Sequence, residues 1–149
     1  MIMQKSLVLL KPDCIQKWYI GEVLSRFERK WLKVVAMKMI EMSDALIQDH
    51  YSHLSDKPFF PEIVNYMTMC PIVALILEGD DSIETLRNMC GATNPLEAAP
   101  GTVRGDLALT IRYNVVHASD GEDAAKEEIA RFFNEDEIFA YNKINDGVL

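Results

Sequence analysis

Four short segments rich in apolar residues constrain the fold of this chain more than any other feature. Residues 6–10 form a continuous apolar run, as expected of a strand that is covered on both faces. Residues 32–42, which include Val34-Val35, are also predicted to form a strand, and residues 71–77 form the most apolar predicted strand of the chain. A fourth strand is centred on Val115-Val116. The sequence therefore predicts a four-stranded sheet.

Segments with helical spacing of apolar residues separate these strands. Ile20, Val23 and Phe27 mark a helix that ends near residue 30, and Ser43 caps a helix that runs to about residue 54. Further helices are expected after Pro61, from Asp81 or Ser82 to Cys90, and over a last segment with Ala125, Ile129, Phe132 and Phe133 on one face. Glycines and prolines between residues 91 and 113 exclude a long regular element, and a loop of that length is usually functional or an assembly contact. The order is βαββαβ, the ferredoxin-like α+β arrangement, with a long loop insertion before the last strand.

Length and composition favour a single domain over residues 1–149. The N-terminal apolar run is interrupted at Lys11 and is too short to span a membrane, so we expect a cytoplasmic protein without a membrane partner. The three cysteines, Cys14, Cys70 and Cys90, form no Cys-x-x-Cys pair and indicate neither a disulfide framework nor a zinc site. The net charge of −8 argues against nucleic-acid binding but permits a small polyphosphate that a few cations hold.

His117 lies where the last predicted strand runs into a helix. Ser119 and Glu122 have the spacing of a capping box, which predicts that the helix starts just after His117 and directs free N–H groups toward the imidazole. Such a helix start attracts phosphate. Imidazole is largely neutral and nucleophilic at physiological pH, so it can form a covalent phosphoryl intermediate. Taken alone, however, a histidine at a strand end is more often a structural residue.

Further motifs precede this histidine in a fixed order. They are KPD at 11–13, DKPFFP at 56–61, GATNP at 91–95 and APGTVRGD at 99–106, followed by NVVHASD at 114–120. In order and spacing, this set resembles the nucleoside diphosphate kinase family from about Leu7 to about Tyr141. The resemblance implies a four-stranded antiparallel sheet with helices on its faces. It also implies that the chain transfers the γ-phosphate of a nucleoside triphosphate to a nucleoside diphosphate, by a ping-pong mechanism through phospho-His117.

The resemblance also assigns the site residues and ligands. No glycine-rich phosphate loop of either common type occurs in the chain, so side chains are expected to hold the phosphates. The implied set is Lys11, Arg87, Thr93 and Arg104 on the phosphates, Asn114 on the sugar, Phe59 stacked on the base, Tyr51 beside His117, and Ser119 with Glu128 positioning the imidazole. ATP, GTP and other nucleoside triphosphates and diphosphates are the implied partners. Mg²⁺ is the implied cofactor, carried by the nucleotide phosphates rather than by a metal site of the protein.

Several of these residues have a structural alternative. Lys11 and Arg87 could be solvated charges, and Arg104 could simply pair with Asp106. Glu128 could be a surface residue, because it belongs to the charged run 126–128.

The aromatic residues and the other histidines also have two interpretations. Phe59 and Phe60 could both belong to the core, and we assign that role to Phe60 while keeping Phe59 for the ligand. His50 and His53 lie close together on a predicted helix, but no third metal ligand is evident, so we interpret both as surface residues.

Two other classes of function fit the same motifs. One is a regulatory module that binds nucleotide and transfers nothing, and the other is a histidine-dependent protein phosphotransferase. The intact set of site residues favours the kinase. Members of the family assemble as hexamers or tetramers through contacts that include the loop at 95–101, so a homo-oligomer is implied.

A few positions depart from the family pattern. Cys14 and Cys70 stand where glycine is common, Gly121 replaces a frequent serine, and Arg112-Tyr113 replaces a frequent Gly-Arg pair, which changes one cationic contact. Trp18 and Trp31 fall at turn positions where a small, flexible or basic residue is usual. One hypothesis is that Trp31, at least, is a glycine in the natural protein, encoded by a reassigned stop codon. The alternative is ordinary surface drift.

Overall fold

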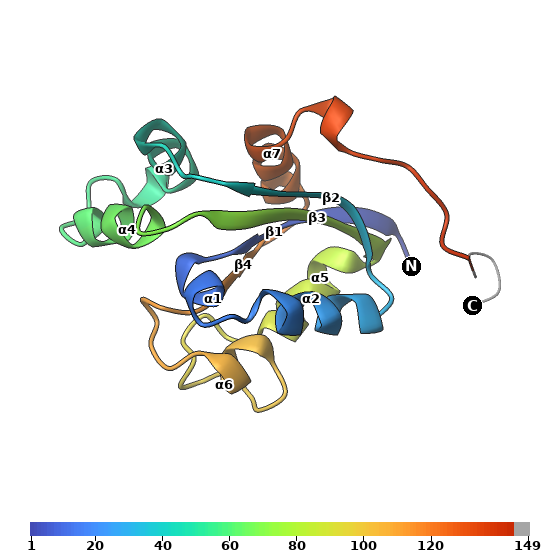
Figure 1. The fold of residues 1–149 in the computed structure, drawn as a ribbon, viewed down its shortest axis with the longest axis horizontal. Coiled ribbons are helices and arrows are strands. Elements are labelled where there is room, and N and C mark those ends of the chain that lie inside the picture. The colour runs from blue at the N-terminus through green and yellow to red at the C-terminus, as the bar shows by residue number, and fades with distance from the viewer. Residues whose placement is uncertain (145–149) are drawn as a thin grey trace.

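The computed structural model describes residues 1–144, and its strands form one antiparallel sheet in the order β2-β3-β1-β4 (Figure 1). The strands are β1 (Met3–Leu10), β2 (Lys33–Ile40), β3 (Ile72–Asp80) and β4 (Val116–Ala118). β1 pairs with β3 along its whole length and with the short β4 only at its C-terminal end. This order and pairing confirm the predicted ferredoxin-like α+β fold.

Alternating side chains of β1 contribute to two hydrophobic layers. Leu7 and Leu9 pack into one apolar cluster, and Val8 and Leu10 pack into the other, because successive residues of a strand point to opposite faces. Helices α3 (Asp44–His50), α4 (Phe60–Met67) and α7 (Glu122–Phe132) contribute to the first cluster, and α1 (Pro12–Gln16), α2 (Ile20–Arg29), α5 (Ser82–Cys90) and α6 (Val103–Leu107) contribute to the second (Figure 1). Burial on both faces explains why residues 6–10 are apolar without alternation.

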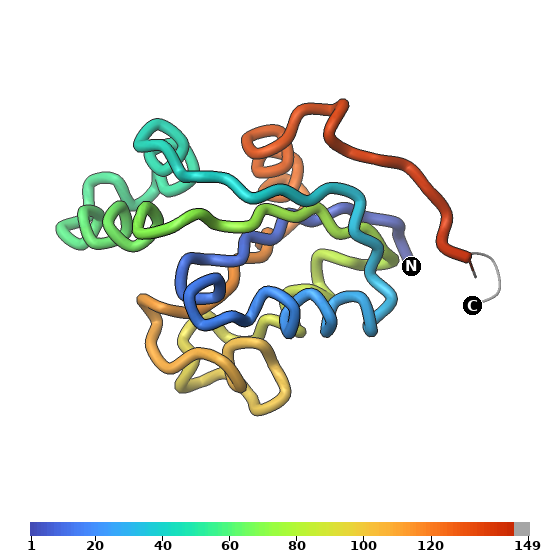
Figure 2. The backbone as a smooth tube through the Cα atoms, viewed as in Figure 1, coloured from blue at the N-terminus to red at the C-terminus, as the bar shows by residue number. Residues whose placement is uncertain are grey.

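The remaining short elements are two 3₁₀ turns, η1 (Ser52–Leu54) and η2 (Glu135–Glu137). After α7 the chain runs back alongside β2 (Figure 2), where the Phe139 N–H donates to the Val35 carbonyl at 2.8 Å. Within residues 1–144, no helix has the length and apolar character needed to cross a membrane.

Two serines predicted as helix caps have different roles. Ser43 caps α3 as predicted, with its hydroxyl accepting from Leu46 N at 3.1 Å. The capping box at Ser119 is wrong, because α7 begins at Glu122 without a side-chain cap. The Ser119 hydroxyl instead accepts from Leu7 N at 3.2 Å, so a tertiary contact to β1 has replaced the local one.

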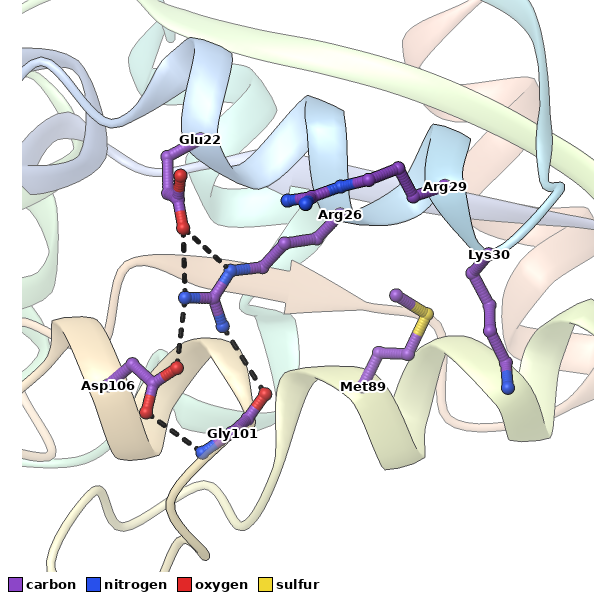
Figure 3. Close-up of a pocket in the computed structure, with 7 residues that line it drawn as sticks. All are labelled: Glu22, Arg26, Arg29, Lys30, Met89, Gly101 and Asp106. Carbon is purple, nitrogen blue, oxygen red and sulfur yellow. Dashed lines mark hydrogen bonds and ion pairs between the residues drawn. The ribbon is translucent and has the colours of Figure 1, made fainter.

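The loop before β4 is fastened to α2 by Arg26. Its guanidinium pairs with Asp106 at 2.9 Å and donates to the Gly101 carbonyl at 3.3 Å, at the edge of a surface cavity of about 480 Å³ (Figure 3). Asp106 is therefore the partner of Arg26, and the alternative in which it pairs with Arg104 is wrong. The loop folds tightly on itself, since a Cβ atom on Gly105 would lie 2.0 Å from a backbone carbonyl oxygen.

Both tryptophans have a left-handed backbone, with φ of 64° at Trp18 and 73° at Trp31. Residues with a Cβ adopt this region at a cost of roughly 1–2 kcal/mol, whereas glycine adopts it freely. Trp18 is 91% exposed, so little packing compensates, while Trp31 is 44% exposed and its ring centroid lies 4.3 Å from the ammonium of Lys143. The backbone supports the hypothesis of natural glycine at both positions, and more strongly at Trp18.

We expect Trp18→Gly to raise the free energy of unfolding by about 1 kcal/mol, because the left-handed conformation then costs nothing. Trp31→Gly should raise it by less, since the cation–π contact with Lys143 is lost. Urea denaturation measures both effects, with Trp18→Ala as the control that keeps a Cβ and gains little. The mass of the protein isolated from its host identifies the natural residues. Destabilisation by both glycine variants, or tryptophan codons at both positions in the gene, would refute the hypothesis.

Candidate active site

A cavity of about 710 Å³ lies between residues of α4 and the loop that precedes β4. Five predicted site residues line it, namely Lys11, Tyr51, Phe59, Thr93 and Asn114. Its volume is in the range of sites that bind small molecules. None of its lining residues belongs to the cavity at Arg26. Residues between positions 11 and 114 thus meet at one cavity, whereas His117, Ser119 and Glu128 lie outside its lining.

Lys11 directly follows β1, and its ammonium is held by Asn114. Lys11 Nζ donates to Asn114 Oδ1 at 2.8 Å, and Asn114 Nδ2 donates to the Thr93 carbonyl at 3.1 Å. Burial, followed by the nearby positive charge of Arg104, lowers the pKa of Lys11 from 10.5 to about 8. The interpretation of Lys11 as a solvated surface charge is therefore wrong.

Phe59 and Phe60 take the two positions that the sequence predicts. Phe60 is 6% exposed and packs in the core, whereas Phe59 is 40% exposed and lines the cavity. The core role of Phe60 is confirmed. Tyr66 and Tyr113 also line the cavity, with ring centroids 5.0 Å apart, and the Tyr66 hydroxyl donates to buried Asp13. Tyr113 belongs to a pair that already departs from the family pattern, whereas no local pattern distinguishes Tyr66 from a core residue.

The two predicted arginines lie outside the lining of this cavity. Arg87 pairs with Asp120 at 2.8 Å, which ties α5 to the turn after His117. Arg104 is 3% exposed and donates to three backbone carbonyls, including those of Asn114 at 3.3 Å and Val116 at 2.6 Å. Those bonds use three of the five N–H groups of a guanidinium. Arg104 therefore holds the backbone around the site.

His117 lies in the middle of β4, and Glu128 from α7 fixes its ring. The Nε2 atom of His117 lies 3.0 Å from Glu128 Oε1, and the same oxygen accepts from the Ser119 hydroxyl at 2.6 Å. Burial alone would raise the pKa of Glu128, but the hydrogen bonds from His117 and Ser119 outweigh it and lower that pKa. Because an ionised carboxylate only accepts hydrogen bonds, the imidazole proton is assigned to Nε2. The interpretation of Glu128 as a surface residue is wrong.

A strained turn immediately precedes β4. Val115 has a φ of 73°, and Val116 N donates across it to the Asn114 carbonyl at 2.8 Å, which is the hydrogen bond of a γ-turn. Such a conformation is unusual for a β-branched residue. The Val115 carbonyl accepts from Lys11 N at 2.9 Å. The turn therefore sets the relative positions of Lys11, Asn114 and His117.

His50 is buried at 7% exposure, so its interpretation as a surface residue is wrong. It ends α3 on the same inward face as buried Ile47, and this spacing of three residues was the available signal. Burial and the neighbouring His117 lower the pKa of His50 from 6.5 to about 3. His53 is exposed in η1, as predicted.

Comparison with known proteins agrees with this geometry. The family model described as nucleoside diphosphate kinase matches residues 4–138. A nucleoside diphosphate kinase of Methanobrevibacter smithii is 45% identical over 148 residues, which cover 99% of this chain and 99% of the relative. The chain belongs to the nucleoside diphosphate kinase family.

Two solved structures of nucleoside diphosphate kinases share the fold. The enzyme of Halobacterium salinarum, in complex with CDP, superposes with a TM-score of 0.95 at 37% identity, covering 99% of this chain and 98% of its own. The enzyme of Borrelia burgdorferi, a transition-state mimic with bound vanadate and ADP, superposes with a TM-score of 0.91 at 35% identity, covering 98% and 96%.

One departure from the family pattern lies at the cavity. Arg112 and Tyr113, which replace a frequent Gly-Arg pair, both line it, and the Arg112 guanidinium forms an ion pair with Glu62 of α4. The positive charge at this part of the cavity is that of Arg112. There it is already paired with a carboxylate.

Proposed function

We propose that the chain transfers the γ-phosphate of a nucleoside triphosphate to a nucleoside diphosphate through a phosphate on Nδ1 of His117. The observation that carries this proposal is the 3.0 Å contact between His117 Nε2 and Glu128. Because Glu128 holds Nε2, the nitrogen left to attack phosphorus is Nδ1. The carboxylate also stabilises the positive charge that the ring develops as it attacks.

The reaction runs in two halves at one site. In the first, the Nδ1 lone pair attacks the γ-phosphorus, and the bond from that phosphorus to the bridging oxygen breaks, so the diphosphate leaves with the electron pair. In the second, a terminal oxygen of another diphosphate attacks the phosphohistidine, and the P–N electron pair returns to the ring. The Nε2 proton stays with His117 and Glu128 in both halves.

The cations around His117 suit the charge on a transferring phosphoryl group. Lys11 lines the cavity, as does the neutral side chain of Thr93. Arg87 on α5 and Arg104 on α6 donate to the β4 carbonyls of Ala118 and Val116. Positioning and electrostatic stabilisation supply most of the catalysis in phosphoryl transfer. We assign these four residues to the phosphates, and Tyr51 to the side of the cavity next to the histidine.

Phe59 and Asn114 complete the nucleotide site. Asn114 is oriented by Lys11 and Thr93, which suits a fixed hydrogen bond to the sugar. The half-exposed ring of Phe59 offers one face to a base, and stacking of this kind accepts any base.

We expect Phe59→Ala to weaken ADP, GDP and CDP binding alike, by about 1–3 kcal/mol, because every base offers a π face. Calorimetric titration measures the three affinities. Phe59→Trp should have a mild effect, and Phe139→Ala, at a 65% exposed phenylalanine outside the cavity lining, is the matched control. Unfolding of Phe59→Ala with unchanged affinity per folded molecule would instead identify Phe59 as a core residue.

The metal, the assembly and the location complete the proposal. Mg²⁺ is part of the nucleotide substrate, and the nearby acidic side chains of Glu128 and Asp120 are already engaged with His117 and Arg87.

A homo-oligomer, hexamer or tetramer, is supported by exposed apolar side chains on the edge strand β2 and in the loop before β4, such as Met39 at 57% and Leu96 at 82%. Light scattering at several concentrations tests the assembly. The cytoplasmic location stays a prediction.

An assay of phosphate transfer from ATP to GDP tests the proposed activity directly. Parallel lines in double-reciprocal plots are expected for the two half-reactions. Nucleotide binding without transfer would identify a regulatory module. Faster transfer from phospho-His117 to protein than to GDP would identify a protein phosphotransferase.

A further inference from the structure

The buried ring of His50 contacts three aromatic rings at the site. Its centroid lies 4.9 Å from that of His117, 4.8 Å from that of Tyr51 and 5.2 Å from that of Phe132. All three contacts are edge-to-face, with interplanar angles of 77° to 85°. The geometry is the favoured one for such pairs. His50 therefore fills the space beside His117 that Glu128 and Ser119 do not occupy.

Arg131 fixes the protonation of His50. The Arg131 Nη1 atom lies 3.0 Å from His50 Nδ1, and Arg131 Nε donates to Asp49 at 3.0 Å. A guanidinium only donates hydrogen bonds, so Nδ1 of His50 must accept and its proton must reside on Nε2. His50 is thereby held as one neutral tautomer.

Positive charges around His50 strengthen this preference. The charged and titratable groups that face it are His117 on β4, Glu128 and Arg131 on α7, Lys11 after β1, and its neighbour Tyr51. His50, His117 and Glu128 each offer a ligand atom, and these atoms lie within 4.8 Å of one another. However, Arg131 already occupies Nδ1 of His50, and Glu128 already occupies Nε2 of His117. The positive charge of the Arg131 guanidinium would also repel a metal cation. The two histidines are instead held by hydrogen bonds to Arg131 and Glu128 and by their edge-to-face contact with each other.

We propose that His50 is a positioning residue, whose neutral ring holds the plane of His117 while Glu128 holds its Nε2 atom, so that Nδ1 faces the γ-phosphate. Two supports are needed because a hydrogen bond at one nitrogen leaves the ring free to tilt about that bond. This inference rests on the proposed role of His117 as the nucleophile.

The rate of phosphohistidine formation with saturating magnesium ATP tests the proposal, measured by rapid quench beside the affinity for ADP. His50→Asn keeps an acceptor for Arg131 but removes the ring, so we expect the rate to fall about 10- to 100-fold while the dissociation constant of ADP changes less than twofold. Arg131→Met keeps the ring but removes its donor. We expect its rate to fall about 10-fold with the dissociation constant of ADP within twofold of wild type, because His50 Nδ1 then has no donor that fixes the ring.

Matched controls separate positioning from general damage. His53→Asn removes an exposed histidine from the neighbouring turn, and Asp49→Ala removes the carboxylate that accepts from Arg131 Nε. Both should leave the rate within twofold of the wild type. A His50→Asn rate within twofold of wild type, or equal losses in rate and ADP affinity, would overturn the proposal. If His50→Asn does not fold, an Arg131→Met rate within twofold of wild type overturns it. Absence of phosphate on wild-type His117 would instead overturn the proposed function.

Discussion

Replacement of His117 by alanine is expected to abolish the uptake of phosphate from magnesium ATP in the absence of an acceptor. The wild-type protein should acquire a phosphate that is labile in acid and stable in base, because the P–N bond of a phosphohistidine has that stability. His117 Nδ1 is the nitrogen that Glu128 leaves available, and alanine provides no nucleophile at that position. The measurement is the phosphate bound per chain after a gel filtration step at high pH.

The exposed histidine His53 supplies a control for this experiment. His53→Ala removes an exposed histidine and should leave uptake intact. Peptide mapping should place the phosphate within residues 114–120. Phosphate that remains on His117→Ala, or intersecting double-reciprocal lines in the wild type, would count against a covalent route.

Removal of the Lys11 ammonium should have the second largest effect. We expect Lys11→Met to lower kcat by about 10²–10³, the range found when one donor is removed from a developing negative charge in a desolvated site. The mutation also removes the donor that orients Asn114 at 2.8 Å, so KM for nucleotides should rise. Lys17→Met, at an exposed lysine at the end of α1, is the matched control and should retain activity.

The pH dependence provides an independent measurement of the same residue. Burial lowers the pKa of Lys11 to about 8, and the charged form is the one that binds phosphate, so kcat/KM should be maximal below that pH and fall as pH rises through it. Lys11→Arg keeps its charge throughout this range and should lack the alkaline limb. A limb that persists in Lys11→Arg would belong to another group.

The sequence predicts the strands and most helices because their signals are local. Residues 6–10 could be assigned to a strand buried on both faces because each face of β1 meets its own apolar layer. Ser43 and Ser119 show the limit of such reasoning. Both have the chemistry of a helix cap, but only Ser43 forms one, because β1 approaches Ser119 and offers Leu7 N instead. No local pattern contains that contact.

In the site, too, residues in local motifs could be predicted and residues placed by tertiary contacts could not. Lys11, Phe59 and Asn114 belong to recognisable motifs and line one cavity as predicted. His50 and Arg131 carry no motif, and their hydrogen bond joins α3 to α7 across 81 residues of sequence. A pairing that distant follows from the packing of the two helices, so the sequence alone suggests two unrelated polar residues.

The γ-turn at Val115 has a consequence for engineering this protein. A β-branched residue at a φ of 73° costs on the order of 1–3 kcal/mol, and glycine would adopt that φ freely. The backbone angle alone would favour glycine at Val115, as it does at Trp18. The two positions differ in burial, since Trp18 is exposed to solvent and the Val115 side chain is fully buried in the hydrophobic layer that β1 shares with α2 and α5. Glycine at Val115 would lose about 1.5–3 kcal/mol of apolar burial, which offsets the relief of the turn, and it would loosen the backbone that leads to the nucleophile. A thermostable variant is therefore better sought at Trp18.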